Sequence, residues 1–277
     1  MRLASCAKAR ILPLMLETTL LPDPLYADPE AYDVAFGWDS SAETAALLAA
    51  AAALLGRAPD RALDVACGAG RTLRDFARAG LTAYGLDRDA RLLRYAKRRL
   101  GELGLSAELI TADMRDFSLP QPVDVACNAI NGIGYLTEPG DLDRHLAALA
   151  ANLVDGGLYV VEMSFGPVQA HWLGKGEPWA FERGTLRVMA DWRLLSVDEE
   201  TGLAVHEATL IIQRRGEPER RVVCRHQMRK WDQPTFYAHV ADSPLRLAQI
   251  LGRDLQPRDP EQRLTYDDDN VFVFLQK

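Results

Sequence analysis

The segment whose residues most clearly point to chemistry is a pair of glycines, Gly68 and Gly70, that follows a short apolar run at 62–66. Residues 71–79 after it have helical patterning. Glycine lets the backbone turn sharply and approach a ligand closely, and the amides at the start of the next helix favour a polar or anionic group. The pattern predicts a ligand site where a strand turns into a helix.

Two aspartates at comparable positions narrow the type of ligand. Asp87 ends a second apolar run at 82–86, and Asp113 follows a third run at 107–111 and precedes Met114. A carboxylate after the second strand can accept both hydroxyls of a ribose. An acceptor next to a soft apolar side chain suits an adenine. The three strand ends together predict a site for an adenosine-containing ligand.

A nicotinamide or flavin dinucleotide is the main alternative, because such sites also combine a glycine turn with an acidic residue. Their third glycine allows close packing of helix on sheet and would fall at position 73, where this chain has Leu73. A pyrophosphate also gives no role to Asp113. The pattern favours an adenosyl ligand without a diphosphate.

The elements that must position these residues alternate along the first part of the chain. Helices are expected from Ser40 or Ser41 to 55, at 71–79, at 89–103 and at 141–153, with further strands at 123–127 and 158–163. Five strands alternating with helices or loops predict a parallel sheet with helices on both faces. The right-handed crossover rule then brings the carboxyl ends of the strands to one edge, where ligands bind.

The patterning changes to a period of two after residue 184. Three alternating runs, at 186–194, 203–214 and 221–231, predict a three-stranded antiparallel element inserted after the fifth strand. A helix at 235–251 and strands at 255–258 and 271–275 complete the expected order. We therefore predict a loose extension over residues 1–25 and one domain over 26–277, with the insertion at about 184–231.

The motifs resemble those of a known family. The run from Leu63 to Gly70 is similar to the D-x-x-C-G-x-G motif of class I S-adenosylmethionine-dependent methyltransferases. Residues 85–87 and 111–116 resemble their second and third motifs, 128–136 the loop after strand four in a small-molecule branch, and Tyr32-Asp33 the N-terminal Y-D segment of that branch. The resemblance implies a Rossmann-like, seven-stranded and mostly parallel sheet, with the run at 271–274 as its antiparallel edge.

The resemblance also implies S-adenosyl-L-methionine as the cofactor. It places Gly68 and Gly70 near the methionine part, Asp64 at its amino end and Asp87 at the ribose. Asp113 and Met114 would meet the adenine. The full set expected to bind the cofactor is Asp64, Ala66, Cys67, Gly68, Gly70, Asp87, Arg88, Asp113, Met114 and Asn128. Ala66 stands where the family often has glycine, and Ala69 where it often has threonine.

The residues expected to close over the cofactor are mostly aromatic. We assign Tyr32, Asn131 and Tyr135 to catalysis, and the acceptor pocket to Tyr26, Trp38, His171 and Trp172. Tyr32 and Trp38 could equally pack the first helix, and the loop at 166–176 with His171 could be a plain surface loop rather than a lid.

Other polar residues are interpreted structurally. His206 and His226 lie on alternating strands and are interpreted as sheet-face residues. The run at 267–269 has no histidine or cysteine nearby and is interpreted as a solvated turn, so no metal is expected.

Composition limits the partners. The net charge is −7, and the basic run at 91–99 has the spacing of a solvated helix face, so no nucleic acid is expected. Four widely spaced cysteines fit the cytoplasm, and no apolar run is long enough for a membrane span. The insertion could wall the acceptor pocket or form a homodimer contact. Residues 1–14 could follow from a mis-assigned start, with Met15 as the native one.

The predicted activity is transfer of a methyl group to a nitrogen or oxygen atom of a small molecule. Methylation of RNA or protein, and a catalytically silent protein that binds the cofactor, remain the alternatives.

Overall fold

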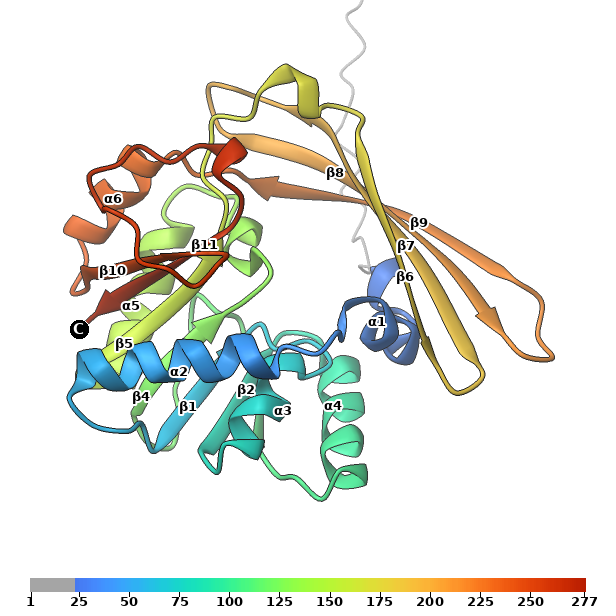
Figure 1. The fold of residues 1–277 in the computed structure, drawn as a ribbon, viewed down its shortest axis with the longest axis horizontal. Helices are drawn as coiled ribbons and strands as arrows, with labels where there is room; N and C mark the ends of the chain where they lie inside the picture. The colour runs from blue at the N-terminus through green and yellow to red at the C-terminus, as the bar shows by residue number, and fades with distance from the viewer. Residues whose placement is uncertain (1–22) are drawn as a thin grey trace, which may run out of the picture.

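The computed structural model describes residues 23–277 (Figure 1). The expectations about residues 1–14 and about Met15 as the start lie outside the described residues. Between residues 23 and 277, no helix combines the length and apolar character needed to cross a membrane.

Seven strands form the central sheet, in the order β10-β11-β5-β4-β1-β2-β3. They are β1 (Arg61–Val65), β2 (Thr82–Asp87), β3 (Glu108–Thr111), β4 (Val123–Asn128), β5 (Leu153–Met163), β10 (Arg246–Gly252) and β11 (Val271–Gln276). Strands β1 to β5 pair in parallel, and β11 is antiparallel to both β5 and β10. The predicted Rossmann-like sheet is confirmed, and its parallel strands end at a common edge.

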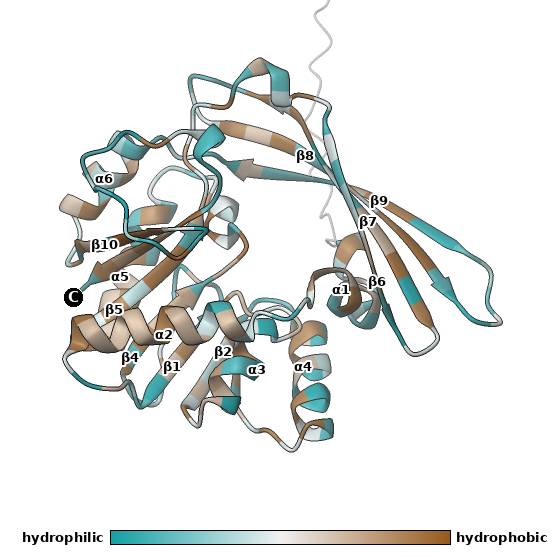
Figure 2. Cartoon of the chain, viewed as in Figure 1, coloured by the Kyte–Doolittle hydropathy of each residue, from teal (hydrophilic) through white to brown (hydrophobic). Residues whose placement is uncertain are grey.

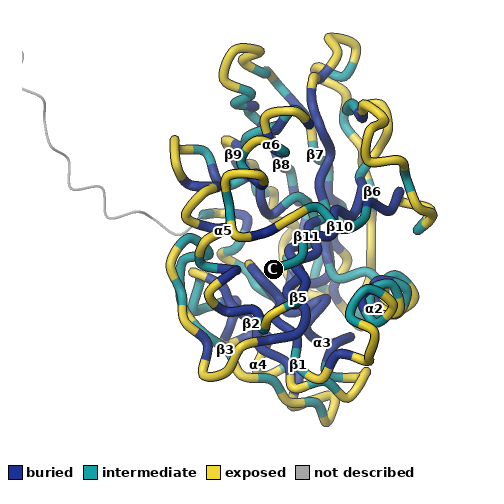
Figure 3. Tube along the Cα trace, turned by 90° about the vertical axis from the view of Figure 1, so that its left-hand side faces the viewer, coloured by how far each residue is buried: buried dark blue, intermediate teal, exposed yellow. Residues whose placement is uncertain are grey.

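Helices cover both faces of this sheet. The helices α2 (Ser41–Leu55), α3 (Arg71–Arg78) and α4 (Ala90–Glu102) share one apolar core, and α5 (Asp141–Asn152) and α6 (Gln233–Ala241) share the other. Both faces of the central strands are buried, as Figure 3 shows in dark blue, so most residues of these strands are apolar, which Figure 2 shows in brown. This packing fixes the strand ends that carry Asp64 and Asp87.

A second sheet has four antiparallel strands in the order β6-β7-β8-β9. They are β6 (Gly176–Arg183), β7 (Leu186–Val197), β8 (Leu203–Arg214) and β9 (Arg220–Arg229). The prediction of an antiparallel insertion is confirmed, but its expected start near 184 and its count of three strands were wrong. Gly176 and Pro178 lower the strand propensity of β6, and an edge strand tolerates them because one side of its backbone is unpaired.

The N-terminal part of the described chain joins the two sheets. The 3-10 helix η1 (Pro24–Tyr26) contacts β9, and helix α1 (Pro29–Phe36) packs against β6, β7 and α4. Leu25 is only 2% exposed within this apolar cluster. Residues 23–25 therefore belong to the fold and not to the loose extension expected over 1–25.

The C-terminal prediction was partly wrong. The helix expected at 235–251 ends at Ala241, and β10 takes up Arg246–Gly252. Pro244 lies between them, where it cannot continue the helix. The strand expected at 255–258 is reduced to a single bridge between Leu251 and Pro257.

Candidate functional site

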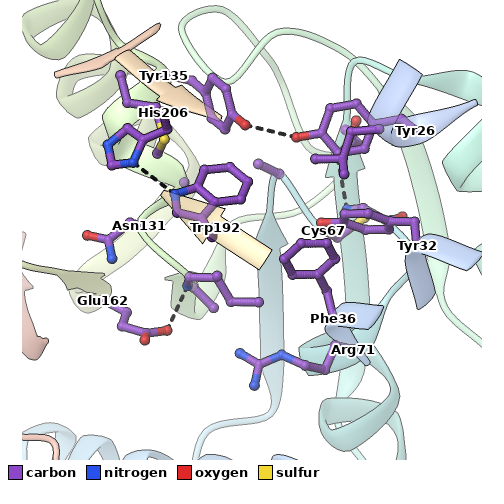
Figure 4. A pocket seen from close by; sticks show the side chains of 18 of the residues that line it. Tyr26, Tyr32, Phe36, Cys67, Arg71, Asn131, Tyr135, Glu162, Trp192 and His206 are labelled. Atoms are coloured by element: carbon purple, nitrogen blue, oxygen red, sulfur yellow. Dashed lines mark hydrogen bonds between the residues drawn. The ribbon is translucent and has the colours of Figure 1, made fainter. Parts of the chain in front are cut away.

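A large cavity lies between the edge of the central sheet and the second sheet. Its volume is about 1820 Å³, and its lining comes from the ends of β1 and β2, from η1 and α1, from the loop after β4, and from β7, β8 and β9. Figure 4 shows part of this cavity, with aromatic side chains on one side and Arg71 and Glu162 on the other. The space is ample for an adenosyl ligand together with a second small molecule.

The glycine turn after β1 forms one end of the cavity. Ala66, Gly68 and Gly70 all have positive φ, at 56°, 53° and 82°. A Cβ on Gly68 would lie 3.3 Å from the ring of Tyr32, so this position is limited both by conformation and by space. Gly70 itself does not line the cavity. It is the N-cap residue of α3 and has a left-handed backbone conformation.

Two buried aspartates follow the strand ends as the sequence predicts. Asp87 accepts hydrogen bonds from the amides of Gly68 and Asp89, both at 2.8 Å, so it fixes the glycine turn to the end of β2. Asp64 accepts one from the Leu73 amide at 2.9 Å. Burial raises the pKa of both carboxyl groups, that of Asp64 to about 7. Both line the cavity, where each carboxylate retains further lone pairs for a ligand.

The third strand end is more polar. Asp113 lines the cavity together with Met114 and Arg88. Its carboxylate pairs with Arg115 at 2.6 Å, and hydrogen bonds from Arg115 lower the pKa of Asp113 to about 2. Arg115 also pairs with Asp141 at 2.9 Å. An adenine amino group would have to share Asp113 with Arg115.

Arg71 is a site residue that the sequence analysis missed. It is the first residue of α3, is 8% exposed and lines the cavity. Among residues 23–277, its Nε and Nη1 atoms have no hydrogen-bond partner, and the Glu43 carboxylate lies 3.8 Å from Nη1. The ring of Trp38 lies under its guanidinium at 4.8 Å. Buried donors without partners are costly, so this guanidinium is suited to an anionic ligand group.

The loop after β4 brings Asn131 and Tyr135 to the cavity. Asn128, the last residue of β4, does not line the cavity. Asn128 is fully buried and donates to the Val65 carbonyl at 2.9 Å. The Ile130 amide donates to Glu162 at 2.6 Å, and Asn131 accepts from the Ser164 amide at 2.8 Å. Both Ile130 and Asn131 have positive φ. The loop is thereby held against β5 in a conformation that most residues disfavour.

Three tyrosines converge on the other end of the cavity. The hydroxyls of Tyr26 and Tyr135 are 3.0 Å apart, and the ring of Tyr26 meets that of Tyr32 edge to face at 5.1 Å. Burial raises the pKa of all three, that of Tyr135 to about 12. At neutral pH all three are uncharged donors and acceptors of hydrogen bonds.

The inner face of the second sheet supplies residues that the sequence analysis did not assign to the site. Trp192, His206 and Cys224 line the cavity, and the Trp192 indole donates to Nδ1 of His206 at 2.9 Å. His226 is buried behind them, with its ring stacked on Trp192 at 5.3 Å. The alternating pattern could have predicted this burial, because His206 and His226 occupy the same alternate positions as the buried apolar residues of β8 and β9.

The remaining predicted residues are divided between the cavity and the surface. Trp38 and Trp172 line the cavity, whereas His171 is exposed and does not. Asp267 accepts from the Trp172 indole at 2.7 Å and so ties the loop after β5 to the segment before β11. Lys230, which sequence reasoning also missed, lines the cavity with Tyr266 under its ammonium at 4.8 Å.

The sheet order and the site at its edge define a class I methyltransferase fold. A family model described as a methyltransferase domain matches residues 62–157. A dTDP-3-amino-3,6-dideoxy-alpha-D-glucopyranose N,N-dimethyltransferase of Streptomyces fradiae is 39% identical over 100 residues, 36% of this chain and 38% of the relative. A dTDP-4-amino-2,3,4,6-tetradeoxy-D-glucose N,N-dimethyltransferase of Saccharopolyspora spinosa is 30% identical over 155 residues, 56% of this chain and 60% of the relative.

Similarity to solved structures extends over most of the chain. DesVI of Streptomyces venezuelae superposes with a TM-score of 0.71 at 24% identity and covers 88% of this chain and 96% of that one. The sugar N-methyltransferase KedS8 of a Streptoalloteichus species gives 0.70 at 21% identity and covers 100% and 99%. At these identities the comparison shows a shared fold, which includes the second sheet.

Proposed function

We propose that the protein is an S-adenosylmethionine-dependent methyltransferase that methylates an amino group of a small molecule, of the amino-sugar class. The single observation that carries the proposal is the cavity itself. It joins the glycine turn, Asp64 and Asp87 at one end to an aromatic wall, which includes Tyr26 and Tyr135, at the other. A donor and an acceptor could meet there with water excluded.

The residues present fit this cofactor. The Nε and Nη1 atoms of Arg71, which have no hydrogen-bond partner among the described residues, suit the carboxylate of the cofactor. The carboxylate of Asp64 suits the ammonium of the cofactor. Gly68 leaves space where any side chain would meet Tyr32, and Asp87 has lone pairs for ribose hydroxyls. When bound, the cofactor supplies an electrophilic methyl group on its sulfonium.

An amine suits the acceptor end better than a hydroxyl. A neutral amine brings its own lone pair, whereas a hydroxyl needs a base to remove its proton in the transition state. The hydroxyls of Tyr26 and Tyr135 are uncharged and can hold an amine by hydrogen bonds. Two relatives whose names specify N,N-dimethyltransferases, acting on amino sugars linked to dTDP, support this choice.

A direct test is to incubate the protein with S-adenosylmethionine and dTDP-3-amino-3,6-dideoxy-alpha-D-glucopyranose and to follow the products by mass spectrometry. We expect the sugar to gain one and then two methyl groups while S-adenosylhomocysteine is released. The matching sugar with a hydroxyl in place of the amine serves as the control and should remain unchanged.

Other outcomes would point to the alternatives. Cofactor binding in calorimetry without methylation of any small amine would favour a catalytically silent protein. Methyl incorporation into total RNA or protein, with none into small amines, would favour a macromolecular acceptor. Normal cofactor affinity in both Gly68→Val and Asp87→Ala would remove the basis of the whole proposal.

Two further expectations concern the context in which the protein works. The outer face of the second sheet carries the half-buried apolar residue Ile211, and we propose that this face forms a homodimer contact. Sedimentation showing a monomer would contradict this. The buried free cysteines Cys67, Cys127 and Cys224 fit the cytoplasm. Fractionation of the cells that make the protein would test that placement.

A further inference from the structure

His226 is a buried histidine on β9 for which the proposed function so far has no role. It lies directly behind Tyr135, whose ring lines the cavity, and its Nδ1 atom is 3.2 Å from the Tyr135 hydroxyl. His226 itself does not line the cavity and is 4% exposed. Its polar contact with a hydroxyl group that lines the cavity is the one with Tyr135.

The two ring nitrogens of His226 face different groups. Nε2 lies 3.2 Å from the Cys224 sulfur, and Nδ1 faces both the Tyr135 hydroxyl and the Asp23 carboxylate at 3.5 Å. A proton on Nε2, directed at the sulfur, leaves the lone pair of Nδ1 free to accept the hydrogen bond of Tyr135. The groups form a row from Tyr26 through Tyr135 and His226 to Asp23.

The surroundings keep this imidazole uncharged until a proton reaches it. Burial lowers the pKa of His226, Arg88 lowers it further, and the Asp23 carboxylate raises it. The other groups that face the ring are neutral. They are Tyr26 at 6.2 Å between ring centres, Tyr135, Cys224, the stacked Trp192 and the cross-strand neighbour His206.

We propose that His226 is a positioning residue that orients the Tyr135 hydroxyl toward the acceptor amine and receives, through that hydroxyl, the proton that the amine gives up. The inference rests on the proposed function, because it gives the amine a route for its proton. When the Tyr135 O–H points at His226, the Tyr26 hydroxyl, 3.0 Å away, is the donor to the Tyr135 oxygen, and a second lone pair of that oxygen is left for the substrate.

The proposed transfer moves one proton from the substrate ammonium to His226 through Tyr135. An ammonium substrate donates N–H to the Tyr135 oxygen while the Tyr135 O–H proton passes to Nδ1 of His226, which gives a neutral amine, an intact tyrosine and an imidazolium. Asp23 stabilises that imidazolium. The amine nitrogen then has the lone pair that methylation requires. The imidazolium passes its proton from Nδ1 to the Asp23 carboxylate at 3.5 Å, whose side chain is 30% exposed and releases it to solvent before the next cycle.

The first test does not need turnover. Nitrogen NMR of the whole protein with labelled histidine should show His226 as the Nε2–H tautomer near neutral pH, with a Nδ1 signal that moves in Tyr135→Phe and stays unchanged in His239→Gln on the surface of α6. A Nδ1–H tautomer would overturn the proposal, because that nitrogen could not receive a proton.

The second test is kinetic and uses dTDP-3-amino-3,6-dideoxy-alpha-D-glucopyranose as acceptor. In His226→Gln we expect kcat to fall by about 100-fold near pH 7, with the cofactor dissociation constant within about twofold of the parent value. The deficit should shrink to below about tenfold near pH 9, where much of the amine is already neutral. His239→Gln should match the parent.

A double variant separates action through Tyr135 from a general effect on the fold. If His226 acts through that hydroxyl, Tyr135→Phe combined with His226→Gln should be no slower than Tyr135→Phe alone. The proposal would be overturned if the loss of kcat in the double variant equalled the product of the losses in the two single variants. A loss of kcat in His226→Gln that is equally large near pH 7 and near pH 9 would also overturn it. Absence of turnover in the parent protein would instead contradict the proposed function and leave the NMR result to decide the tautomer.

Discussion

At the scale of single residues, Arg71 is the group whose surroundings most clearly call for a ligand. Its guanidinium is buried at the start of α3, beside the glycine turn, and the nearest carboxylate, that of Glu43, is 3.8 Å away. Figure 4 shows it extending from α3 into the cavity on the side of Glu162. A cation held this way is largely desolvated without a close counter-charge, so binding of an anion there would recover a favourable interaction.

We therefore predict that Arg71→Met weakens S-adenosylmethionine binding by about 10- to 100-fold, the loss of one charged hydrogen bond of about 1.5–3 kcal/mol. Calorimetry with the decarboxylated analogue supplies the contrast, since its affinity should change little. Arg78→Met, on the exposed side of the same helix, is the control. Equal losses for both ligands would mean that Arg71 supports the turn rather than the carboxylate.

Asp64 gives a prediction about pH. Burial raises the pKa of its carboxyl group to about 7, so in the free protein it is increasingly protonated below that pH. A cofactor ammonium beside it favours the carboxylate and would release the proton. Affinity for S-adenosylmethionine should therefore fall as the pH drops below about 7.

This linkage is measurable by calorimetry at about pH 6 in two buffers of different ionisation enthalpy, which report the protons released on binding. Asp64→Asn should release none through this group and should bind more weakly at every pH. An identical apparent enthalpy in both buffers for the parent protein would exclude a protonated Asp64.

Gly68, Asp87 and Asp113 could be predicted from the sequence because each follows an apolar run that must be a strand, and parallel strands end together. Arg71, His206 and His226 could not, because their importance depends on which face of an element they occupy and on what lies opposite. A basic residue at a helix start also runs against the helix dipole. Only the folded neighbours explain its place there.

At the scale of elements, the contact that joins the two sheets centres on Asp33 of α1. Its buried carboxylate accepts hydrogen bonds from Arg74 of α3 at 3.0 Å, from Tyr95 of α4 at 2.8 Å and from Arg183 of β6 at 2.6 Å. One side chain thus ties three parts of the molecule that are far apart in sequence. Arg74 is itself 8% exposed, so its positive charge depends on the Asp33 carboxylate at 3.0 Å.

We predict that Asp33→Asn destabilises the protein by about 3 kcal/mol, since it leaves a buried arginine without its counter-charge. Chemical denaturation would measure the change. Asp254→Asn, which removes an exposed pair with Arg258, should cost much less stability than Asp33→Asn. Similar small losses in both variants would show that the buried cluster contributes little to stability.

Sequence patterning predicted the elements with clear periodicity and missed those with weak or competing signals. The period-two runs of β7, β8 and β9 were found, whereas β6 was hidden by Gly176 and Pro178. The segment at 246–251 is predicted to be the end of a helix over 235–251, because its apolar residues fit a helical spacing as well as a strand. Its pairing with β11 decides in favour of the strand, and a single sequence cannot show that pairing.

At the scale of the whole molecule, the two sheets are separate bodies that enclose the cavity between them. The central sheet supplies the glycine turn, Asp64 and Asp87, and the second sheet supplies Trp192, His206 and Cys224. Figure 1 shows the two sheets as separate layers. A ligand that fills this space touches both bodies at once. Binding should therefore stabilise the fold as a unit.

We expect S-adenosylmethionine at about 100 times its dissociation constant to add about 2.7 kcal/mol of stability. For a chain of this size the corresponding rise in Tm is about 5–10 °C, which differential scanning fluorimetry would detect. Gly68→Val should unfold below the parent temperature without ligand, because of its positive φ and the contact with Tyr32, and should show no further rise when the ligand is added. A shift of the parent's size in that variant would place the ligand elsewhere.

The division between the sheets has a consequence for how such a protein can diversify. Wall residues on the inserted strands project from alternate positions, and substitutions there leave the glycine turn, Asp64 and Asp87 untouched. Substitutions there can therefore change which acceptor binds without changing how the methyl donor is bound, as long as the contact between Asp33 and Arg183 holds the second sheet in place. Related proteins with this architecture can therefore differ in the product that they make and still use the same methyl donor.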